Sequence, residues 1–246
     1  MGLAVDSLRD TLSFVSRSRG FLVLVLFFSV VYFVGDLFVS LFSPGSVVGV
    51  LLSLLVVFVV SFLLVCVVYC LLREGSLSGA LAVLSRYLVN LVLAEILIFL
   101  TLLLLFVPFI VLFVVAYVIL LAVWPIGVLL MVAVIVLGAV SYVYASTRLF
   151  LTSPSIVFND LSALSSMRNS WAISKGKVSI IFSTVLAFSI TFVALLVISE
   201  LSGVLFKGVL YYPLLALNSV IRSIYTLSSP VLSVMLFKHV SGHMRK

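Results

Sequence analysis

Long runs of apolar residues dominate this chain, and short polar passages separate them. The runs predict six membrane-spanning helices, at about residues 21–42, 47–72, 88–123, 126–147, 178–199 and 213–237. Each run reaches the roughly 20 apolar residues that a helix needs to cross the hydrocarbon core of a bilayer. Such long runs are typical of helices, because the strands of a membrane barrel show short alternating segments. The pattern predicts an all-α polytopic membrane protein, with residues 1–246 in a single membrane domain.

Three polar passages predict amphipathic helices on the membrane surface. Residues 1–19 predict an interfacial helix, whose apolar face is formed by Val5, Leu8, Leu12 and Val15. Residues 76–87 and 154–175 predict two cytoplasmic elbow helices, each of which joins two spans. We expect Asp160 to cap the N-terminus of the second elbow, since aspartate is favoured there. We also expect Pro108 to break the long apolar run that contains it.

Composition and charge narrow the class of protein. Hydrophobic residues make up 65% of the chain and charged residues 9%, against about 25% charged residues in soluble domains. Apart from Lys207 and Arg222, every Lys and Arg falls on one side of the six-span arrangement. The positive-inside rule makes that side, which carries both termini, cytoplasmic. The net charge of +7 does not indicate nucleic-acid binding, because no basic stripe with interleaved aromatics occurs.

The sequence offers little for catalysis or metal binding. Cys66 and Cys70 lie inside one apolar run, where buried free thiols are the expected state. His239 and His243 have a spacing that suits a metal on a helix, but no third ligand accompanies them, so we expect a solvated tail. We therefore predict no enzymatic activity, no cofactor and no metal site.

Arg168 lies in the apolar stripe of the second elbow. That stripe is formed by Leu161, Leu164, Met167, Arg168 and Trp171. Arg168 has two interpretations: it extends to a lipid phosphate, or it faces the bundle and holds the elbow through a carboxylate. The periodicity does not separate them. We group six residues as candidates for contact with the elbows or with lipid headgroups: Arg86, Asp160, Arg168, Trp171, Lys175 and Lys177.

Four polar residues within the predicted spans form a candidate intramembrane site: Asp36, Glu95, Asn218 and Arg222. Charged side chains are costly in lipid and normally pair in the protein interior. The helical rise places Asp36 and Arg222 at similar depths, roughly 24 Å from the cytoplasmic side, so we predict that they pair. Glu95 lies about 12 Å from that side, within reach of Arg148 or Arg168. We favour a structural pair for Glu95 over a proton or ion site.

The second elbow resembles a segment of a known family. Pro154, Ala163, Leu164, Arg168, Ser170, Trp171, Lys175 and Gly176 match a pattern found in YciC-like proteins and in the membrane domain attached to some glycerophosphodiester phosphodiesterases. The resemblance implies a six-span prokaryotic membrane protein with two amphipathic elbows. It implies no phosphodiesterase activity, because the chain has no room for the catalytic domain and lacks its His/Glu metal ligands.

The leading functional hypothesis is a non-enzymatic scaffold or accessory protein of the prokaryotic cell membrane. Its elbows and basic cytoplasmic collar suit anionic headgroups, so its expected partners are membrane lipids and either further copies of itself or another membrane protein. The alternative is a small transporter or exporter that uses the intramembrane polar residues. A lipid-modifying enzyme is a third hypothesis, which the lack of an activated nucleophile disfavours.

Overall fold

A computed structural model describes residues 2–42, 47–205 and 211–242, with side chains described for all of these except residues 2, 36–42, 47–54, 56, 57, 199–205 and 211. Within this part the chain forms nine α-helices and no strand, which confirms the predicted all-α class. The helices are α1 Gly2–Arg17, α2 Arg19–Phe42, α3 Val47–Glu74, α4 Leu77–Ala122, α5 Trp124–Leu149, α6 Thr152–Asn159, α7 Ala163–Ile173, α8 Val178–Leu205 and α9 Tyr211–Ser241.

Several of these helices are long and apolar enough to cross a membrane. Among the described residues, four candidates pass that test: Leu77–Ala122, Trp124–Asn159, Val178–Ile198 and Tyr212–Ser241. A bent pair, Leu3–Arg17 with Arg19–Gly35, adds a fifth if it forms one span. The predicted span at residues 47–72 falls partly on side chains outside the described set, so the count of six stays a prediction.

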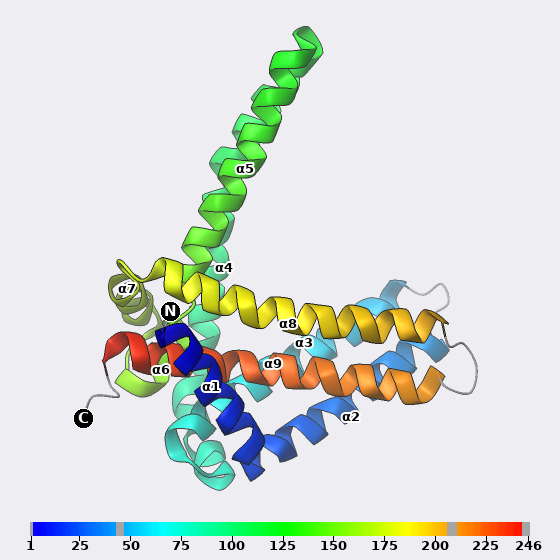
Figure 1. Cartoon of the computed structure of the whole chain (residues 1–246), viewed down its shortest axis with the longest axis vertical. Helices are drawn as coiled ribbons and strands as arrows, with labels where there is room; N and C mark the ends of the chain where they lie inside the picture. The colour runs from blue at the N-terminus through cyan, green and yellow to red at the C-terminus, as the bar shows by residue number, and fades with distance from the viewer. Residues whose placement is uncertain (1, 43–46, 206–210, 243–246) are drawn as a thin grey trace. The chain divides into compact units, whose positions relative to one another are not determined.

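The chain divides into two compact units, which are described separately. Unit 1 comprises Met1–Leu88 and Ile180–Lys246, and unit 2 comprises Val89–Ser179. In unit 1, helices α2, α3, α8 and α9 lie side by side, and α9 packs against α1, α2 and α3 (Figure 1). The fully buried core of this unit includes Phe21, Phe28, Val68, Leu227 and Leu236.

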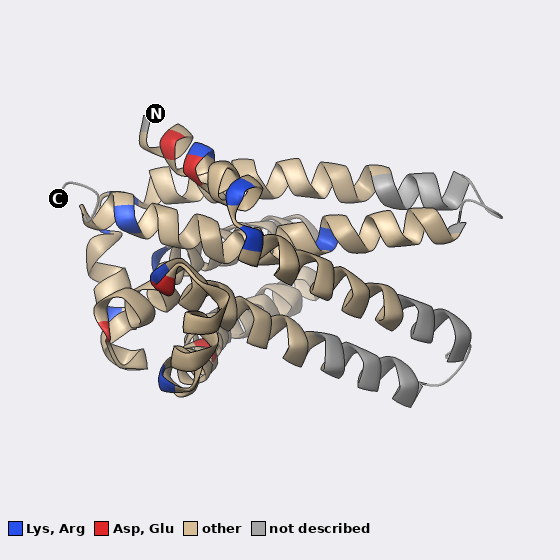
Figure 2. Ribbon diagram, turned by 90° about the horizontal axis from the view of Figure 1, so that it is seen from below, with Lys and Arg blue, Asp and Glu red and all other residues tan. Residues whose placement is uncertain are grey.

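One end of unit 1 gathers charged residues. Figure 2 shows Lys and Arg concentrated toward the end of the bundle where both termini lie. There the α1–α2 junction, the end of α3 and the end of α9 meet, since Arg17, Gly75 and Lys238 line one pocket. Cys66 and Cys70 are buried and not joined in a disulfide, as predicted.

In unit 2, helices α4 and α5 form an antiparallel hairpin (Figure 1). The rings of Phe106 and Tyr142 lie 5.5 Å apart across it. Apolar side chains cover its outside, and Leu121 and Leu129 are each 72% exposed. Apolar surface on this scale is unfavourable in water, so the hairpin fits a lipid environment.

Helix α4 corrects one prediction and modifies another. Pro108 lies inside α4 and does not break it. Prolines are tolerated in membrane helices, because local adjustments and neighbouring groups satisfy the freed backbone carbonyl. The first predicted elbow, residues 76–87, is continuous with α4, which begins at Leu77.

The second predicted elbow forms two short helices, α6 and α7, that pack against each other. The prediction that Asp160 caps the N-terminus of the second elbow is wrong. It ends α6 in the left-handed conformation, with φ 52° and ψ 38°, which aspartate tolerates better than most residues. Ser162, with extended backbone, takes the N-cap position of α7.

Candidate functional site

A buried arginine fixes α7 to the end of α5. Arg148 lies in the last turn of α5 and is only 7% exposed. Its guanidinium donates to the Ser174 hydroxyl (Nε to Oγ, 3.2 Å), to the Tyr144 hydroxyl (2.7 Å) and to the Trp171 carbonyl oxygen. A guanidinium suits this task because it presents several donors in a planar fork. Satisfied donors make its burial tolerable, and they hold α7 in place.

Ring stacking and a return hydrogen bond strengthen the same junction. The guanidinium carbon of Arg148 lies 4.3 Å from the Trp171 ring centroid and 5.5 Å from that of Tyr144. The Ser170 hydroxyl donates to the Arg148 carbonyl oxygen at 2.6 Å. The last carbonyls of a helix have no partner within it, so this bond satisfies one of them. Helices α5 and α7 are therefore joined in both directions.

Helix α7 packs through small residues, most of them serines. Ala163, Ser166 and Ser170 form its buried face. The Asn169 amide Nδ2 donates to the Ser155 hydroxyl of α6 at 3.2 Å. The Ser166 hydroxyl is buried and has no hydrogen-bond partner among the described residues. Small side chains allow the close approach of two helix backbones.

The apolar stripe of α7 is left on the outside. Leu164 is 53% exposed and Trp171 is 42% exposed. Arg168 is also exposed, and no carboxylate of the described residues forms an ion pair with it. Of its two interpretations, the outward-facing one fits this placement. Arg148, and not Arg168, is the arginine that anchors the helix.

In unit 1, helix α1 also places small polar side chains against the protein. Ser7 and Thr11 are buried at 0% and 1% exposure, whereas Val5 and Leu12 are 57% and 64% exposed. Ser7 and Thr11 thus lie on the side of α1 that packs on α9. Of the predicted apolar face, Val5 and Leu12 are exposed and Leu8 and Val15 are half-buried, while the charged Asp6, Arg9 and Arg17 are exposed as well. The predicted amphipathic helix is present, and its small polar residues make the contact with the protein.

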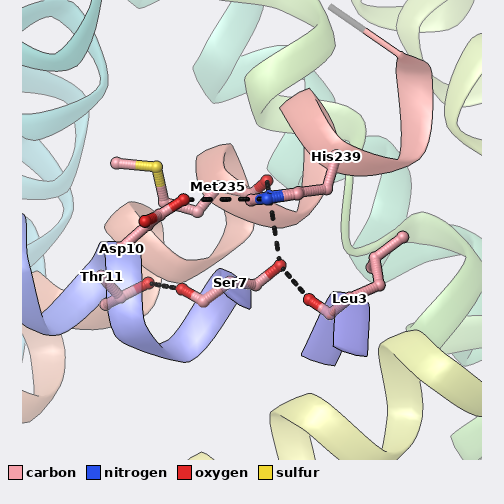
Figure 3. Close-up of polar contacts among 6 residues, drawn as sticks. All are labelled: Leu3, Ser7, Asp10, Thr11, Met235 and His239. Carbon is pink, nitrogen blue, oxygen red and sulfur yellow. Dashed lines mark hydrogen bonds and ion pairs between the residues drawn. The ribbon is translucent and has the colours of Figure 1, made fainter. Parts of the chain in front are cut away.

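A polar cluster joins α1 to the last turns of α9 (Figure 3). The Ser7 hydroxyl lies 3.3 Å from His239 Nδ1 and donates to the Leu3 carbonyl oxygen at 2.9 Å. His239 Nε2 lies 3.7 Å from an Asp10 carboxylate oxygen. The His239 side chain is only 16% exposed, so the expectation of a solvated tail is wrong for this residue. His243 lies outside the described residues.

This cluster has the residue types of a Ser-His-Asp triad without its geometry. His239 Nδ1 lies 2.8 Å from the Met235 carbonyl oxygen, an acceptor that requires a proton on Nδ1. A nitrogen that carries this proton cannot accept one from Ser7, as a triad base must. Ser7 is also fully buried, out of reach of a substrate. The cluster therefore fastens α1 to α9.

The Glu95 carboxylate accepts a hydrogen bond from a serine and not from the predicted arginine. The Ser153 hydroxyl of α6 donates to Glu95 Oε1 of α4 at 3.1 Å. The suggested partner Arg148 makes its bonds to α5 and α7 instead. Glu95 thus links α4 to the short helices of unit 2.

The remaining predicted intramembrane residues belong to unit 1. Asn218 is buried and Arg222 is half-buried, one turn apart on α9. The side chain of Asp36 lies outside the described set, so its pairing with Arg222 stays a prediction. Glu95 is part of unit 2, and the four residues do not form one site within either unit.

The other basic candidates are peripheral. Arg86 is exposed, and its guanidinium carbon lies 5.4 Å from the ring centroid of Tyr87. Lys175 is exposed and Lys177 half-buried, on either side of Gly176, whose φ of 75° ends the α7 turn. These positions add positive charge beside α4 and α7 without forming a closed site.

Sequence reasoning missed Ser7 and Asp10 as contact residues, and it missed the role of Arg148 as the anchor of α7. One signal was available: serines recur at four-residue spacing through Ser166, Ser170 and Ser174, which marks one face of a helix.

Among the described residues, no group of three His, Cys, Asp or Glu side chains is placed to hold a metal ion. Comparison with protein-family models, curated proteins and solved structures finds no match to this chain.

Proposed function

We propose that this protein is a non-enzymatic membrane scaffold that organises lipids through two surface helices, α1 and α7. One observation carries the proposal. Both helices place small polar side chains against the protein and leave large apolar side chains exposed, Leu164 and Trp171 on α7 and Val5 and Leu12 on α1. A surface helix that served only the protein core would bury its apolar face instead.

The outward face of α7 has the composition of a lipid-contacting surface. Trp171 stacks one ring face on Arg148 yet remains 42% exposed, and tryptophan is enriched where headgroups meet hydrocarbon. Leu164 supplies apolar area, and Arg168 is long enough to reach a phosphate. Lys175 and Lys177 follow directly and suit anionic headgroups.

The finer expectations belong to the same proposal. We propose six spans, both termini in the cytoplasm, a prokaryotic cell membrane and kinship with the YciC-like proteins, as the elbow residues suggest. Self-assembly of the scaffold is part of the proposal, since a lipid-organising protein acts over an area larger than one chain.

The depth of Trp171 tests the proposal. The chain has two tryptophans, so Trp124→Phe leaves Trp171 as the only one. This variant would be reconstituted with phospholipids that carry bromine either near the ester groups or near the chain ends. We expect stronger fluorescence quenching by the shallow bromine. Absence of quenching, or stronger quenching by the deep bromine, would contradict an interfacial α7.

Native mass spectrometry after mild detergent extraction tests the assembly. A defined oligomer that retains anionic lipid supports the scaffold. A lipid-free monomer that also mediates solute flux in liposomes would replace the scaffold with the transporter.

A further inference from the structure

We infer that unit 1 holds a binding site for the phosphodiester headgroup of an anionic phospholipid, between Arg17, Ser18 and Lys238. The three residues line a pocket of about 610 Å³. The pocket forms beside a bend of 79° between α1 and α2. The inference rests on the proposed function for the lipid surroundings, and the site shares no residue with α7.

Two cations come together in this pocket from distant parts of the sequence. Arg17 is the last residue of α1, and Lys238 lies in the last turn of α9. Arg17 is exposed, and no carboxylate of the described residues forms an ion pair with it. An exposed guanidinium at the rim of a pocket can form paired hydrogen bonds with phosphate oxygens.

The Asp10 carboxylate also lines the pocket, but it faces the His239 imidazole. Asp10 Oδ2 lies 3.7 Å from His239 Nε2. With Arg17 and Lys238 against Asp10, the charges that line the pocket sum to +1. The pocket therefore favours a monoanion such as a lipid phosphodiester over a cation.

Neutral donors complete the polar side. The hydroxyls of Ser13 and Ser18 line the pocket. Ser18 immediately precedes α2, and its Oγ accepts from the Phe21 amide at 3.3 Å. Helix α1 ends and α2 begins at this point, so the two helix dipoles offset each other and the side chains supply the net attraction for a phosphate.

Part of the pocket lining is apolar, which favours a lipid over a soluble anion. Phe14 and Met235 line the same pocket. Inorganic phosphate has no group that would contact them favourably, whereas the glycerol and first methylenes of a phospholipid do.

The test measures retained lipid by native mass spectrometry. The whole chain would be reconstituted in nanodiscs of equal parts phosphatidylglycerol and phosphatidylcholine, and then released in mild detergent. We expect one retained phosphatidylglycerol that Arg17→Gln weakens about fivefold and the Arg17→Gln/Lys238→Gln pair roughly 30-fold, at about 1 kcal/mol per cation. Arg9→Gln is the matched control, because Arg9 is an exposed cation of the same helix outside the pocket.

Three outcomes would overturn the inference. The first is equal lipid retention by the double variant and by Arg9→Gln. The second is a lower thermal stability of Arg17→Gln with unchanged retention, which would assign the cation to the helix end alone. The third is displacement of the lipid by millimolar inorganic phosphate, which would make the site one for a soluble anion.

Two further measurements keep these results separate from folding and from the proposed function. The charge-preserving Arg17→Lys/Lys238→Arg pair should retain the lipid, even if the double glutamine variant folds poorly. Trp171 quenching by shallow bromine should persist in the Arg17→Gln variant. Absence of Trp171 quenching in the protein without the Arg17 change would contradict the proposed membrane contact of α7. It would not contradict the headgroup site.

Discussion

Arg148 holds Trp171 by both its ring and its backbone. The guanidinium stacks at 4.3 Å from the ring centroid and also donates to the carbonyl oxygen of the same residue. Stacking fixes the orientation of the indole, and the backbone bond fixes the helix that carries it. One ring face is occupied by the guanidinium, and Trp171 remains 42% exposed.

We predict that Arg148→Met lowers the free energy of unfolding by about 2–3 kcal/mol, because it removes hydrogen bonds from a buried charged donor to three acceptors. Arg148→Lys should recover only part of this loss, since an ammonium cannot reproduce the planar fork. Unfolding in mixed micelles with increasing dodecyl sulfate would measure both values.

The matched control for Arg148→Met is Arg168→Met, which changes an arginine on α7 of the same unit. Arg168 is exposed, so this change should stay within about 0.5 kcal/mol. If Arg168→Met cost as much as Arg148→Met, Arg168 would be the residue that anchors α7.

Gly127 predicts a test of the α4–α5 hairpin. A Cβ at this position would lie 2.1 Å from the Leu120 Cα, a backbone atom that cannot move aside. We expect Gly127→Ala to destabilise the protein by about 1–3 kcal/mol through overpacking. Thermal unfolding followed by circular dichroism would measure the loss.

Gly138→Ala is the control for the hairpin, and we expect no loss of stability from it. Its Cβ would lie 3.4 Å from the ring of Phe109, an ordinary contact. Alanine is favoured over glycine within a helix by up to about 1 kcal/mol, so this variant should be equally or more stable. Equal destabilisation by the two variants would argue against the close approach at Leu120.

The cluster around His239 predicts the mobility of α1. Replacement by leucine removes the contacts of the imidazole with Ser7 and Asp10. We expect amide hydrogen exchange in α1 to rise roughly fivefold, as for the loss of about 1 kcal/mol. Asp10→Asn should raise exchange in the same segment, and Asp6→Asn, an exposed change on the same helix, should not.

The predicted pairing of Asp36 with Arg222 calls for a double-mutant cycle. Arg222→Leu alone should strand a carboxylate and cost about 3 kcal/mol or more. The Asp36→Leu/Arg222→Leu pair should recover part of that cost, as measured by dodecyl sulfate titration. Strict additivity of the two single changes would count against the pair.

Sequence reasoning gave the helical class and the buried thiols, because both follow from the length and polarity of the apolar runs. It misjudged Pro108, whose effect depends on whether neighbouring groups satisfy the freed carbonyl. It misplaced the cap at Asp160, because aspartate suits a helix N-cap and a left-handed C-cap, and local sequence does not say which.

The polar junctions were beyond prediction for a different reason. Ser7 and His239 are separated by 232 residues, and no local pattern brings such residues together. Sequence reasoning offered Arg148 as a partner of Glu95. Its acceptors include the backbone carbonyl of Trp171, which the identity of that residue does not reveal. Periodicity separated Leu164 and Trp171 from Ser166 and Ser170 on α7, but it could not say which side meets the protein.

The serine face of α7 has a thermodynamic consequence. Release of this helix would expose mainly hydroxyls, amides and a guanidinium, with one face of the Trp171 ring as the chief apolar part. Heat capacity rises mainly with exposed apolar area. Local release of α7 should therefore show a nearly constant enthalpy across temperature, and its attachment should not weaken on cooling as a hydrophobic contact does.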